Sequence, residues 1–428
     1  MFEKWQHFLK ESKQMEDFYK KFKVFLVGGS VRDSLLNRAS HDADYVVVGA
    51  TPQDMLDVGF SQVGAEFPVF IHPKTGDEYA LARSERKSGE GHKGFTTNTE
   101  DIPIEKDLER RDLTINALAR MMLSSGEYGD IVDPYGGKKD IENKLLRHVS
   151  EAFEEDPLRV LRVARFAAQL DFSAAPETEE LMSNMVGRGM LDSLTPERIW
   201  KETEKALSSD RPDKYFEVLA KCGALDRFMP ELSKLRGVPQ PQQYHGENDA
   251  WMHTMAAVRA ARSITSDPEI IWAVVNHDLG KGATSKDVLP HHYGHEMAGI
   301  PLVKAANERL KVPSSFSDLA EMSTENHMRV HIVKKMRPEK VVDLLYRTDA
   351  FRKPERFEKF LRVSEADARS HKGREFEEGD FIRNAFEVCR KVSAKELVDQ
   401  GFVGKQIGEK LRQNRIAAYK NYLRGENK

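Results

Sequence analysis

Two aspartates, Asp42 and Asp44, are separated by a single alanine and followed by the apolar run 45–48. In an extended strand alternate side chains point to the same face, so both carboxylates are expected on one face. Two carboxylates this close together are costly unless cations lie between them. A pair of divalent metal ions held in this way activates a hydroxyl group and stabilises a pyrophosphate leaving group, as nucleotidyl transfer requires. Calcium loops and surface turns also contain this pattern, so the pair alone leaves those alternatives open.

A strand-like run over residues 23–27 enters the turn Gly28–Gly29, and a helix-like run follows over 30–36. Glycine lets the backbone approach a ligand closely, and the N–H groups at the start of a helix suit phosphate. The residues fit neither the dinucleotide-binding fingerprint nor the P-loop pattern, so a turn without a ligand is the alternative. The nearby aspartate pair favours the phosphate-binding interpretation.

Arginines occur at two further places in the first 170 residues. Arg110 and Arg111 precede a helix-like run, and guanidinium groups bind triphosphate oxygens through a fixed fork of donors. Arg159, Arg162 and Arg165 recur every three residues after Asp156 and Pro157 and therefore line one side of a helix, opposite Val160, Val163, Ala164 and Ala167. A solvated arginine face is the simpler explanation, but beside the aspartate pair it would form a nucleotide clamp.

A second group of candidate ligands lies in the C-terminal half. His253 precedes the His277–Asp278 pair by 24 residues, and a glycine-rich turn with Lys281 follows that pair. Imidazole and carboxylate groups can hold a divalent transition metal whose bound water attacks phosphate. Further imidazoles that could complete a second metal site or contact phosphate are His291, His292, His295, His327 and His331.

In their order along the chain, these patterns resemble the motifs of class II tRNA nucleotidyltransferases, the CCA-adding enzymes. The resemblance rests on residues 26–33, Asp42, Asp44, 110–117, 133–137, 155–159 and 196–198. The C-terminal half resembles the HD domain of multifunctional CCA proteins. Similar proteins carry Asp after the histidine at the position of His327, whereas this chain has Met328. The first 21 residues are an extension beyond the pattern.

The resemblance implies that a single pocket accepts CTP and ATP, and that the tRNA 3′-hydroxyl attacks the α-phosphate of CTP twice and of ATP once. Asp42 and Asp44 would be catalytic and bind Mg²⁺. A carboxylate accepts from an exocyclic amino group and a guanidinium donates to a ring acceptor, so Asp156 and Arg159 could read the edges shared by cytosine and adenine. The remaining nucleotide contacts would come from Gly29, Arg32, Arg111, Arg162 and Arg165.

For the C-terminal half, the resemblance implies 2′,3′-cyclic phosphodiesterase, 2′-nucleotidase and phosphatase activity. Its metal would be Ni²⁺ or another divalent transition metal, held by His253, His277, Asp278 and Asp349.

The expected fold is an α/β nucleotidyltransferase head, a small mixed sheet with helices, followed by helices alone. Strand-like runs occur in residues 1–150, which form the head, and from Glu151 onward amphipathic helical runs follow one another. We expect a helical neck that binds nucleotide and tRNA at 151–249, an HD phosphohydrolase domain at 250–351 and a helical tail at 352–428. The Pro- and Gln-rich stretch 237–249 is predicted as a linker, and the glycine-rich basic stretch 83–94 as a loop near the active site.

Composition restricts the partners and the cellular location. The 66 basic and 69 acidic residues give a net charge of −3, so only local patches, such as the seven basic residues in 405–428, favour a nucleic acid. No apolar run approaches the roughly 18 residues of a membrane helix, and the N-terminus has no signal-peptide pattern. Cys222 and Cys389 do not indicate a disulfide framework. We expect a cytoplasmic monomer or homodimer that meets tRNA, CTP and ATP but no membrane.

Three other interpretations compete. A bacterial poly(A) polymerase shares the head and neck motifs, but the HD half and the absence of a long basic tail disfavour it. An HD-type nucleotide phosphohydrolase with a nucleotide-sensing head would not need two metal-binding carboxylates. A noncatalytic RNA-binding protein is disfavoured for the same reason, and because the chain lacks aromatic stacking motifs.

Overall fold

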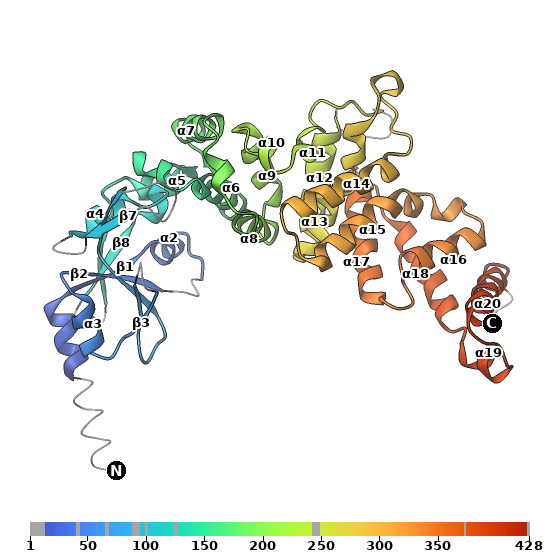
Figure 1. The fold of residues 1–428 in the computed structure, drawn as a ribbon, viewed down its shortest axis with the longest axis horizontal. Helices are drawn as coiled ribbons and strands as arrows, with labels where there is room; N and C mark the ends of the chain where they lie inside the picture. Colours follow the sequence, from blue (N-terminus) through green and yellow to red (C-terminus); the bar gives the residue numbers. More distant parts are fainter. Residues whose placement is uncertain are drawn as a thin grey trace, which may run out of the picture. The chain divides into compact units, whose positions relative to one another are not determined.

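The computed structural model describes residues 13–39, 43–64, 68–87, 95–98, 102–123, 127–241, 249–371 and 374–425. The chain divides into two compact units, Met1–Leu194 and Thr195–Lys428. The strands belong to the first unit, and the second consists of helices (Figure 1). This architecture confirms the predicted fold class, a mixed sheet with helices followed by a helical region.

A seven-stranded sheet forms the centre of the first unit, in the order β3-β4-β5-β2-β1-β8-β9. Only the β2–β5 pair is parallel among these neighbours, so the sheet is mixed. Its strands are β1 (Lys23–Val27), β2 (Asp44–Val48), β3 (Ser61–Val63), β4 (Val69–Ile71), β5 (Glu78–Leu81), β8 (Ala119–Met122) and β9 (Tyr128–Val132). Two short pairs accompany it: β6 (Ser84–Lys87) with β7 (Phe95–Asn98), and β10 (Leu145–Leu146) with β11 (Ser173–Ala174).

The β6–β7 pair falls within the stretch 83–94, which we predicted to be a loop. Ser84 to Lys87 pair antiparallel with Phe95 to Asn98, so this part of the prediction is corrected to a strand. Residues 88–94 lie outside the described part of the chain. In the predicted linker 237–249, residues 242–248 also lie outside it, and Pro239 forms an isolated bridge with Asp249.

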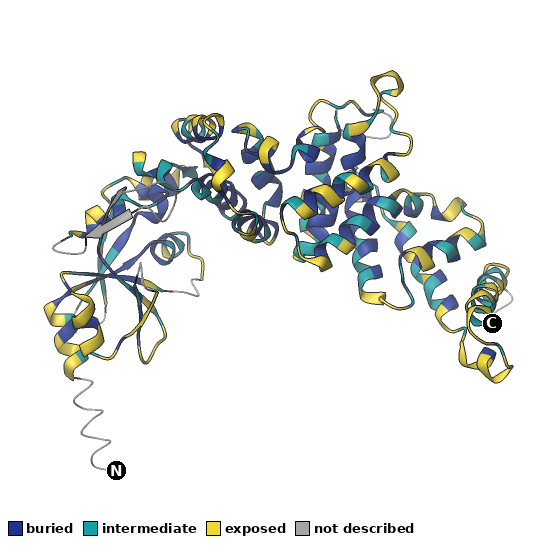
Figure 2. Ribbon diagram, in the orientation of Figure 1, coloured by how far each residue is buried: buried dark blue, intermediate teal, exposed yellow. Residues whose placement is uncertain are grey.

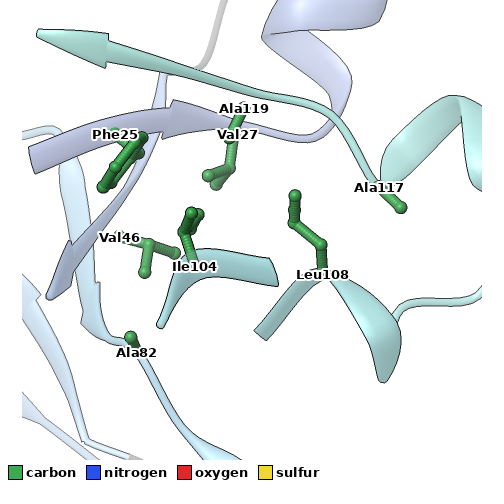
Figure 3. Packing of buried hydrophobic residues seen from close by; sticks show 8 residues of the cluster. All are labelled: Phe25, Val27, Val46, Ala82, Ile104, Leu108, Ala117 and Ala119. Atoms are coloured by element: carbon green, nitrogen blue, oxygen red, sulfur yellow. The ribbon is translucent and has the colours of Figure 1, made fainter. Parts of the chain in front are cut away.

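One face of the sheet is covered by helix α4 (Ile104–Glu109). Phe25 and Val27 alternate on β1 and share this face with Val46 of β2. Ile104 and Leu108, one helical turn apart, pack against them, as Figure 3 shows. Each such side chain contributes about 2 kcal/mol when fully buried. The packing therefore anchors α4 and fixes the start of the segment that follows it, residues 110–112.

The opposite face carries Tyr45 and Tyr79, which pair across β2 and β5 and stack at 4.5 Å between ring centroids. A helical segment over residues 13–21 packs on this side. Its Phe18 is buried against Phe60, and its Tyr19 hydroxyl is 3.0 Å from the Tyr79 hydroxyl. The predicted N-terminal extension is therefore an integral part of the head from residue 13 onward.

The other helices of the first unit are α2 (Gly29–Leu35), α3 (Pro52–Asp57), α5 (Gly137–Glu142), α6 (Leu158–Leu170) and α7 (Pro176–Gly187), with the 3-10 helices η1 (Thr114–Asn116), η2 (Glu151–Glu155) and η3 (Met190–Ser193). The 133–137 motif has a structural role. Asp133 Oδ1 accepts from the Gly137 N–H at 2.7 Å, at the start of α5. A Cβ atom at Gly137 would lie 2.2 Å from the Thr114 carbonyl oxygen, so glycine lets α5 support η1 directly.

The second unit contains a bundle in which α12 (Ala250–Ile264), α13 (Pro268–Asn276), α14 (His295–Arg309), α15 (Ser314–His331) and α17 (Pro354–Ser370) pack together. Figure 2 shows their buried faces turned inward. Asp249 and Asp267 cap the first two of these helices by accepting backbone N–H groups. The predicted boundary at residue 351 separates α17 from helices that it packs against.

The remaining helices of this unit lie before and after the bundle in the chain. Before it come α8 (Pro196–Leu207), α9 (Pro212–Lys221), α10 (Leu225–Phe228) and α11 (Pro230–Ser233). Between α13 and α14 are η4 (Leu279–Ala283) and η5 (Lys286–Val288), and η6 (Val333–Lys335) follows α15. Toward the C-terminus α16 (Pro338–Arg347), α18 (Glu377–Arg390) and α20 (Lys405–Leu423) pack on one another, and α19 (Lys395–Asp399) contacts α20. Among the described residues, no helix is both long and apolar enough to cross a membrane.

Replacing Phe18 with alanine tests whether the N-terminal segment stabilises the head. Truncating a buried phenylalanine costs about 3 kcal/mol, which lowers the melting temperature of a unit of this size by roughly 6–12 °C. Differential scanning calorimetry of the full chain measures the shift in the transition of the first unit. The matched control is Lys20→Ala in the same helical segment, since its side chain is 63% exposed. Equal melting of the two variants would show that the segment contributes nothing.

Candidate functional site

The Gly28–Gly29 turn joins β1 to α2 and lies beside Asp44. Antiparallel pairing of β1 with β2 puts Val27 opposite Asp44, so the first residue of β2 is next to the turn. Gly28 has φ 69°, and a Cβ atom there would lie 2.9 Å from Nη1 of Arg111. Both the backbone angle and the available space therefore require glycine. The guanidinium group of Arg111 can therefore lie close to the backbone of Gly28, next to Asp44.

A cavity of about 670 Å³ opens at this turn. It brings together Gly29, Arg32, Asp44, Arg111, Asp156, Arg159, Arg162 and Arg165 from the sequence prediction. Asp42, the other predicted carboxylate, lies outside the described residues. Gly28 and Arg110, which belong to the phosphate-binding patterns in the sequence, also line it. The lining further includes residues that we did not predict: Asp112, Asn116, Leu158, Phe166 and Gln169. Six arginines and three aspartates give the cavity an excess of positive charge, which suits a polyphosphate.

A chain of hydrogen bonds joins the walls of this cavity. Arg32 on α2 donates through Nη1 to Asn116 Oδ1 at 2.7 Å, and Asn116 Nδ2 donates to Asp112 Oδ1 at 3.0 Å. Arg162 on α6 completes the chain, because its Nε donates to Asp112 Oδ2 at 2.8 Å. Two predicted nucleotide-binding arginines are thus positioned by the same buried carboxylate.

Asp112 remains negatively charged in this setting. Burial alone would raise the pKa of Asp112, but the Arg162 guanidinium and the hydrogen bond from Asn116 outweigh it and lower the pKa to about 2. The sequence contains a signal for this residue, since Asp112, Thr114 and Asn116 alternate with apolar residues in the run 112–119. That pattern predicts that these polar side chains are buried, but it does not predict which arginines form hydrogen bonds with them.

Arg159 is held by the backbone. Its Nη1 donates to the Ala152 carbonyl and its Nη2 to the Arg110 carbonyl, both at 2.7 Å. Asp156 Oδ1 accepts from the Leu158 N–H at 3.0 Å, at the start of α6. These bonds fix the carboxylate and the guanidinium that we predicted to read the base, and each Nη atom of Arg159 retains a second hydrogen.

Phe166 lies among three of the arginines. The guanidinium carbon of Arg165 is 4.0 Å from its ring centroid, and those of Arg32 and Arg162 are 5.2 and 5.6 Å away. The negative face of an aromatic ring attracts such cations. Arg165 also donates through Nη1 to Gln169 Oε1 at 2.5 Å. Phe166 therefore reduces the mutual repulsion of the arginines that line the cavity.

A second candidate site lies in the bundle of the second unit. His253 on α12, His277 and Asp278 after α13, His295 on α14 and His327 on α15 all present buried side chains to one another. The Asp278 carboxylate is within 3.5 Å of Nε2 of each of the four histidines. Lys281 Nζ is 2.6 Å from Asp278 Oδ2 and donates to Gln240 Oε1 at 2.6 Å.

A close approach of two backbones assembles this site. A Cβ atom at Gly280 would lie 1.9 Å from the His295 carbonyl oxygen and 2.7 Å from the Gly299 nitrogen. Only glycine allows η4 to pack this tightly on α14, so the glycine after His277–Asp278 brings Asp278 to His295.

Asp349, the predicted fourth ligand, does not lie in this group, and Asp367 lies there in its place. Asp349 follows α16 with φ 54°, and its carboxylate pairs with Arg352 at 2.6 Å and Arg356 at 3.6 Å. Asp367 on α17 instead lies 3.1 Å from His253 Nε2 and 3.7 Å from His277 Nε2. Its signal in the sequence is a carboxylate on the apolar face of a helix. The predicted domain boundary at residue 351 left this helix, α17, outside the HD domain.

Asp367 also accepts from His331, whose Nε2 is 2.6 Å from its Oδ2. The described residues near the cluster also include His371, whose ring stacks on His253 at 5.2 Å and which belongs with His253 and Asp367 to a possible ligand group. Two of the other predicted imidazoles are used differently. His292 bonds Thr284 and the Pro239 carbonyl, and His291 is exposed and stacks on Tyr293.

The charged groups of the cluster shift one another's pKa values. Burial alone would lower the pKa of His277, but Asp278 and Asp367 outweigh it and raise the pKa to about 10. Burial acts in the opposite direction on Asp278, yet His277 and Lys281 hold its pKa well below the usual range. His277 Nε2 and Asp278 Oδ1 are buried without a hydrogen-bond partner. Buried donor atoms of this kind, on imidazole and carboxylate, fit a divalent transition metal.

Comparison with known proteins agrees with the fold. Residues 24–147 match the family model described as the poly A polymerase head domain, and residues 171–235 match the one described as a probable RNA and SrmB-binding site of polymerase A. Among solved structures, a CCA-adding enzyme in complex with ATP has a TM-score of 0.64 at 20% identity, covering 94% of this chain and 88% of that chain.

Two other structures give the same result. A tRNA-processing enzyme complex has a TM-score of 0.59 at 22% identity, covering 95% of this chain and 98% of that one. The Thermotoga maritima CCA-adding enzyme complexed with tRNA has a TM-score of 0.61 at 19% identity, covering 94% and 89%. This chain therefore has the fold of the CCA-adding enzymes, and its first unit contains a region similar to the poly A polymerase head domain.

Replacing Arg162 with methionine tests the charge network of the cavity. Because burial then acts on Asp112 without the guanidinium, its pKa is expected to rise from about 2 to above the ordinary value of about 3.9. The depressed wild-type pKa stabilises the fold by about 2.5 kcal/mol above pH 4, and this contribution is lost as the pH falls toward 2. NMR titration of ¹³C-labelled aspartate carboxyls measures the shift.

The matched control for this titration is Arg188→Met, since Arg188 pairs with Glu154 at an exposed position. That variant should leave the pKa of Asp112 unchanged. The same Asp112 midpoint in both variants would contradict the network.

Proposed function

We propose that the first unit is a template-independent nucleotidyltransferase that adds CCA to the 3′ end of tRNA from CTP and ATP and releases pyrophosphate. The observation that carries the proposal is the arginine-lined cavity at the Gly28–Gly29 turn, with Asp44 at its edge. The similarity to enzymes whose structures are described with ATP, CTP and tRNA supports it. The proposal includes action in the cytoplasm, as a monomer or homodimer.

In this proposal Asp42 and Asp44 hold Mg²⁺. When bound, the ion lowers the barrier for attack of the tRNA 3′-hydroxyl on the α-phosphate and stabilises the leaving pyrophosphate. Arg32 and Arg111 contact the phosphates beside the Gly29 backbone, and Arg162 and Arg165 hold the rest of the nucleotide. The hydrogen bonds that Arg32 donates to Asn116 and Arg162 donates to Asp112 keep these two arginines in place before the nucleotide arrives, which reduces the ordering cost of binding.

Base selection in the proposal depends on Asp156 and Arg159. The Asp156 carboxylate accepts from the exocyclic amino group of cytosine or adenine, and Arg159 donates to the adjacent ring nitrogen. Uracil and guanine present a carbonyl where cytosine and adenine present the amino group. A buried acceptor facing another acceptor costs about 1–3 kcal/mol, so both bases are rejected. The backbone bonds that fix Arg159 keep it from adapting to the wrong base.

Asp44→Ala is expected to lower the rate of nucleotide addition about 1,000-fold or more. Losses of this size are typical when electrostatic stabilisation of a transition state is removed. The assay incubates tRNA lacking its 3′ CCA with Mg²⁺ and labelled CTP or ATP, separately and together, and resolves the products on a gel. Wild type should add two C residues and one A. Asp42→Ala should behave like Asp44→Ala, while Asp57→Ala, at an exposed position on α3, should retain full activity.

Other outcomes of this assay support the competing interpretations. Long A tails would identify a poly(A) polymerase. No addition by wild type would favour a nucleotide-sensing head attached to a phosphohydrolase.

We propose a second activity for the second unit, metal-dependent phosphohydrolysis of 2′,3′-cyclic phosphates, 2′-nucleotides and other phosphomonoesters. The buried histidine and aspartate cluster specifically favours it. His253, His277, Asp278 and Asp367 would hold Ni²⁺ or another divalent transition metal. Such an ion, when bound, supplies a water nucleophile of lowered pKa. Lys281 holds Asp278 Oδ2 in place, and His331 does the same for Asp367 Oδ2.

Asp367→Asn is expected to reduce hydrolysis of 2′,3′-cyclic AMP at least 100-fold, because the amide is a poor metal ligand. Asp349→Asn is the matched control and should remain active, since Asp349 pairs only with arginines among the contacts described. The measurement is product formation after chelation and reloading with Ni²⁺, Co²⁺ or Mn²⁺. Loss of activity in Asp349→Asn with retention in Asp367→Asn would reverse the correction.

A further inference from the structure

Asp107 on α4 is a fully buried carboxylate next to the nucleotide cavity, and it is not one of the residues that line it. It precedes Arg110 and Arg111 by three and four residues, a spacing at which side chains on a helix can meet. Arg110 donates to Asp107 Oδ1 through Nη2 at 2.7 Å and through Nε at 3.2 Å. Arg111 donates through Nη2 to the other oxygen, Oδ2, at 3.2 Å. One carboxylate thus joins two arginines that line the cavity.

Packing fixes the position of this carboxylate. Ile104 and Leu108 on the same helix are buried against the sheet (Figure 3), and the Arg83 backbone N–H donates to Asp107 Oδ1 at 3.4 Å. Burial alone would raise the pKa of Asp107, but the two guanidinium groups outweigh it and lower the pKa. The carboxylate is therefore charged at neutral pH and cannot turn away from its partners.

The contact with Asp107 orients the guanidinium group of Arg111. Its Nη2 is held by the carboxylate, and its Nη1 lies beside the Gly28 backbone, where a Cβ atom would be only 2.9 Å away. Its Nε is buried without a hydrogen-bond partner. Because the guanidinium group is planar, holding Nη2 also determines where Nη1 lies. Nη1 is therefore kept at the glycine turn, where we propose that the phosphates bind.

Stability alone does not account for this arrangement. A buried ion pair contributes little to stability, because the cost of removing the charges from water offsets their attraction. The apolar contacts of Ile104 and Leu108 already attach α4 to the sheet. Binding is different, since an arginine that moves freely loses conformational entropy when it binds a ligand. A carboxylate that holds the arginine beforehand removes part of that cost.

We propose that Asp107 is a positioning residue of the nucleotide site, which holds Arg111 in the orientation that binds the phosphate groups of CTP and ATP. Arg110 completes the arrangement by neutralising the other oxygen of the carboxylate. Asp107 contacts no reacting atom and acts through Arg111. The inference rests on the proposed nucleotidyltransferase function and extends it, because that function names the arginine but not the group that orients it.

The test measures binding of phosphate groups directly. Asp107→Asn keeps the shape of the side chain but removes its charge and turns an N–H group toward one of the arginines. CTP, ATP and pyrophosphate are titrated separately into the full-length protein with Mg²⁺ and without tRNA, by isothermal titration calorimetry. We expect Kd to rise about tenfold for all three, the size typical of losing a hydrogen bond between charged groups. A rise for only one nucleotide would indicate an effect on base selection and overturn the proposal.

Asp213→Asn is the matched control. Asp213 is equally buried and also accepts from two arginines, Arg211 at 2.8 Å and Arg259 at 3.1 Å, but it belongs to the second unit. This variant should leave all three Kd values unchanged. Differential scanning calorimetry of both variants separates a loss of folding from a loss of binding. An equal loss of affinity in Asp213→Asn would show a general effect of such substitutions and overturn the positioning role.

Two further variants separate an effect through Arg111 from a structural one. In the Arg111→Met background, Asp107→Asn should weaken binding by less than about twofold more, whereas independent effects would multiply and overturn the proposal. Arg111→Lys keeps the charge but cannot reach Asp107 and a phosphate with two arms of one planar group. It should lose as much affinity as Arg111→Met, and full affinity would overturn the proposal. This second comparison does not depend on folding of an Asp107 variant.

The outcomes also distinguish this inference from the proposed function. Unchanged affinities in Asp107→Asn, with CCA addition by the wild type intact, would overturn the inference alone. A wild type that binds CTP and ATP but adds neither to tRNA would overturn the proposed function, while the comparison of affinities would still decide the role of Asp107. A wild type that binds neither nucleotide would overturn both.

Discussion

A buried carboxylate that stays ionised down to about pH 2 organises the cavity of the first unit. Asp112 lies where water is excluded, and an ionised carboxylate there is tolerated only because Arg162 and Asn116 surround it. The carboxylate in turn determines where Arg162 and Asn116 lie, because both donate hydrogen bonds to it. A cavity lined by many arginines would otherwise expand through their mutual repulsion. The buried aspartate and the ring of Phe166 together keep this concentration of positive charge compact.

The second unit uses the same physical principle with a different outcome. Asp278 is also buried and ionised, but besides Lys281 the groups around it are imidazoles, which can be either neutral or charged. The carboxylate of Asp112 is satisfied by permanent donors, whereas that of Asp278 keeps an oxygen without one. In our proposal, this difference separates a structural charge, Asp112, from a metal ligand, Asp278. It shows that burial of a carboxylate is informative about function only when its partners are known.

The sequence predicted the head, and most of the residues that we predicted for its nucleotide site line one cavity, because their signals are local. Strand alternation around Val27 and Val46 fixes which side chains share a face, and helical spacing puts Arg162 and Arg165 on one side of α6. Asn116 and Asp112 were missed as site residues since their partners are distant in the chain. Asp367 was missed because recognising it requires knowing that α17 returns to the bundle. The sequence shows the glycine at position 280, but it does not predict that this glycine packs against the backbone of His295.

The packing of Phe18 and Tyr19 on the sheet affects how this domain can be delimited. The family model begins at residue 24, yet the covering of the tyrosine-bearing face begins before it. A fragment cut at the family boundary would expose Phe60, Tyr79 and their neighbours as one apolar surface, and surfaces of this kind promote aggregation. The domain that folds therefore begins one short helix before the region that the family model matches. An expression fragment or fusion of this domain should therefore include the helical segment 13–21 and not begin at residue 24.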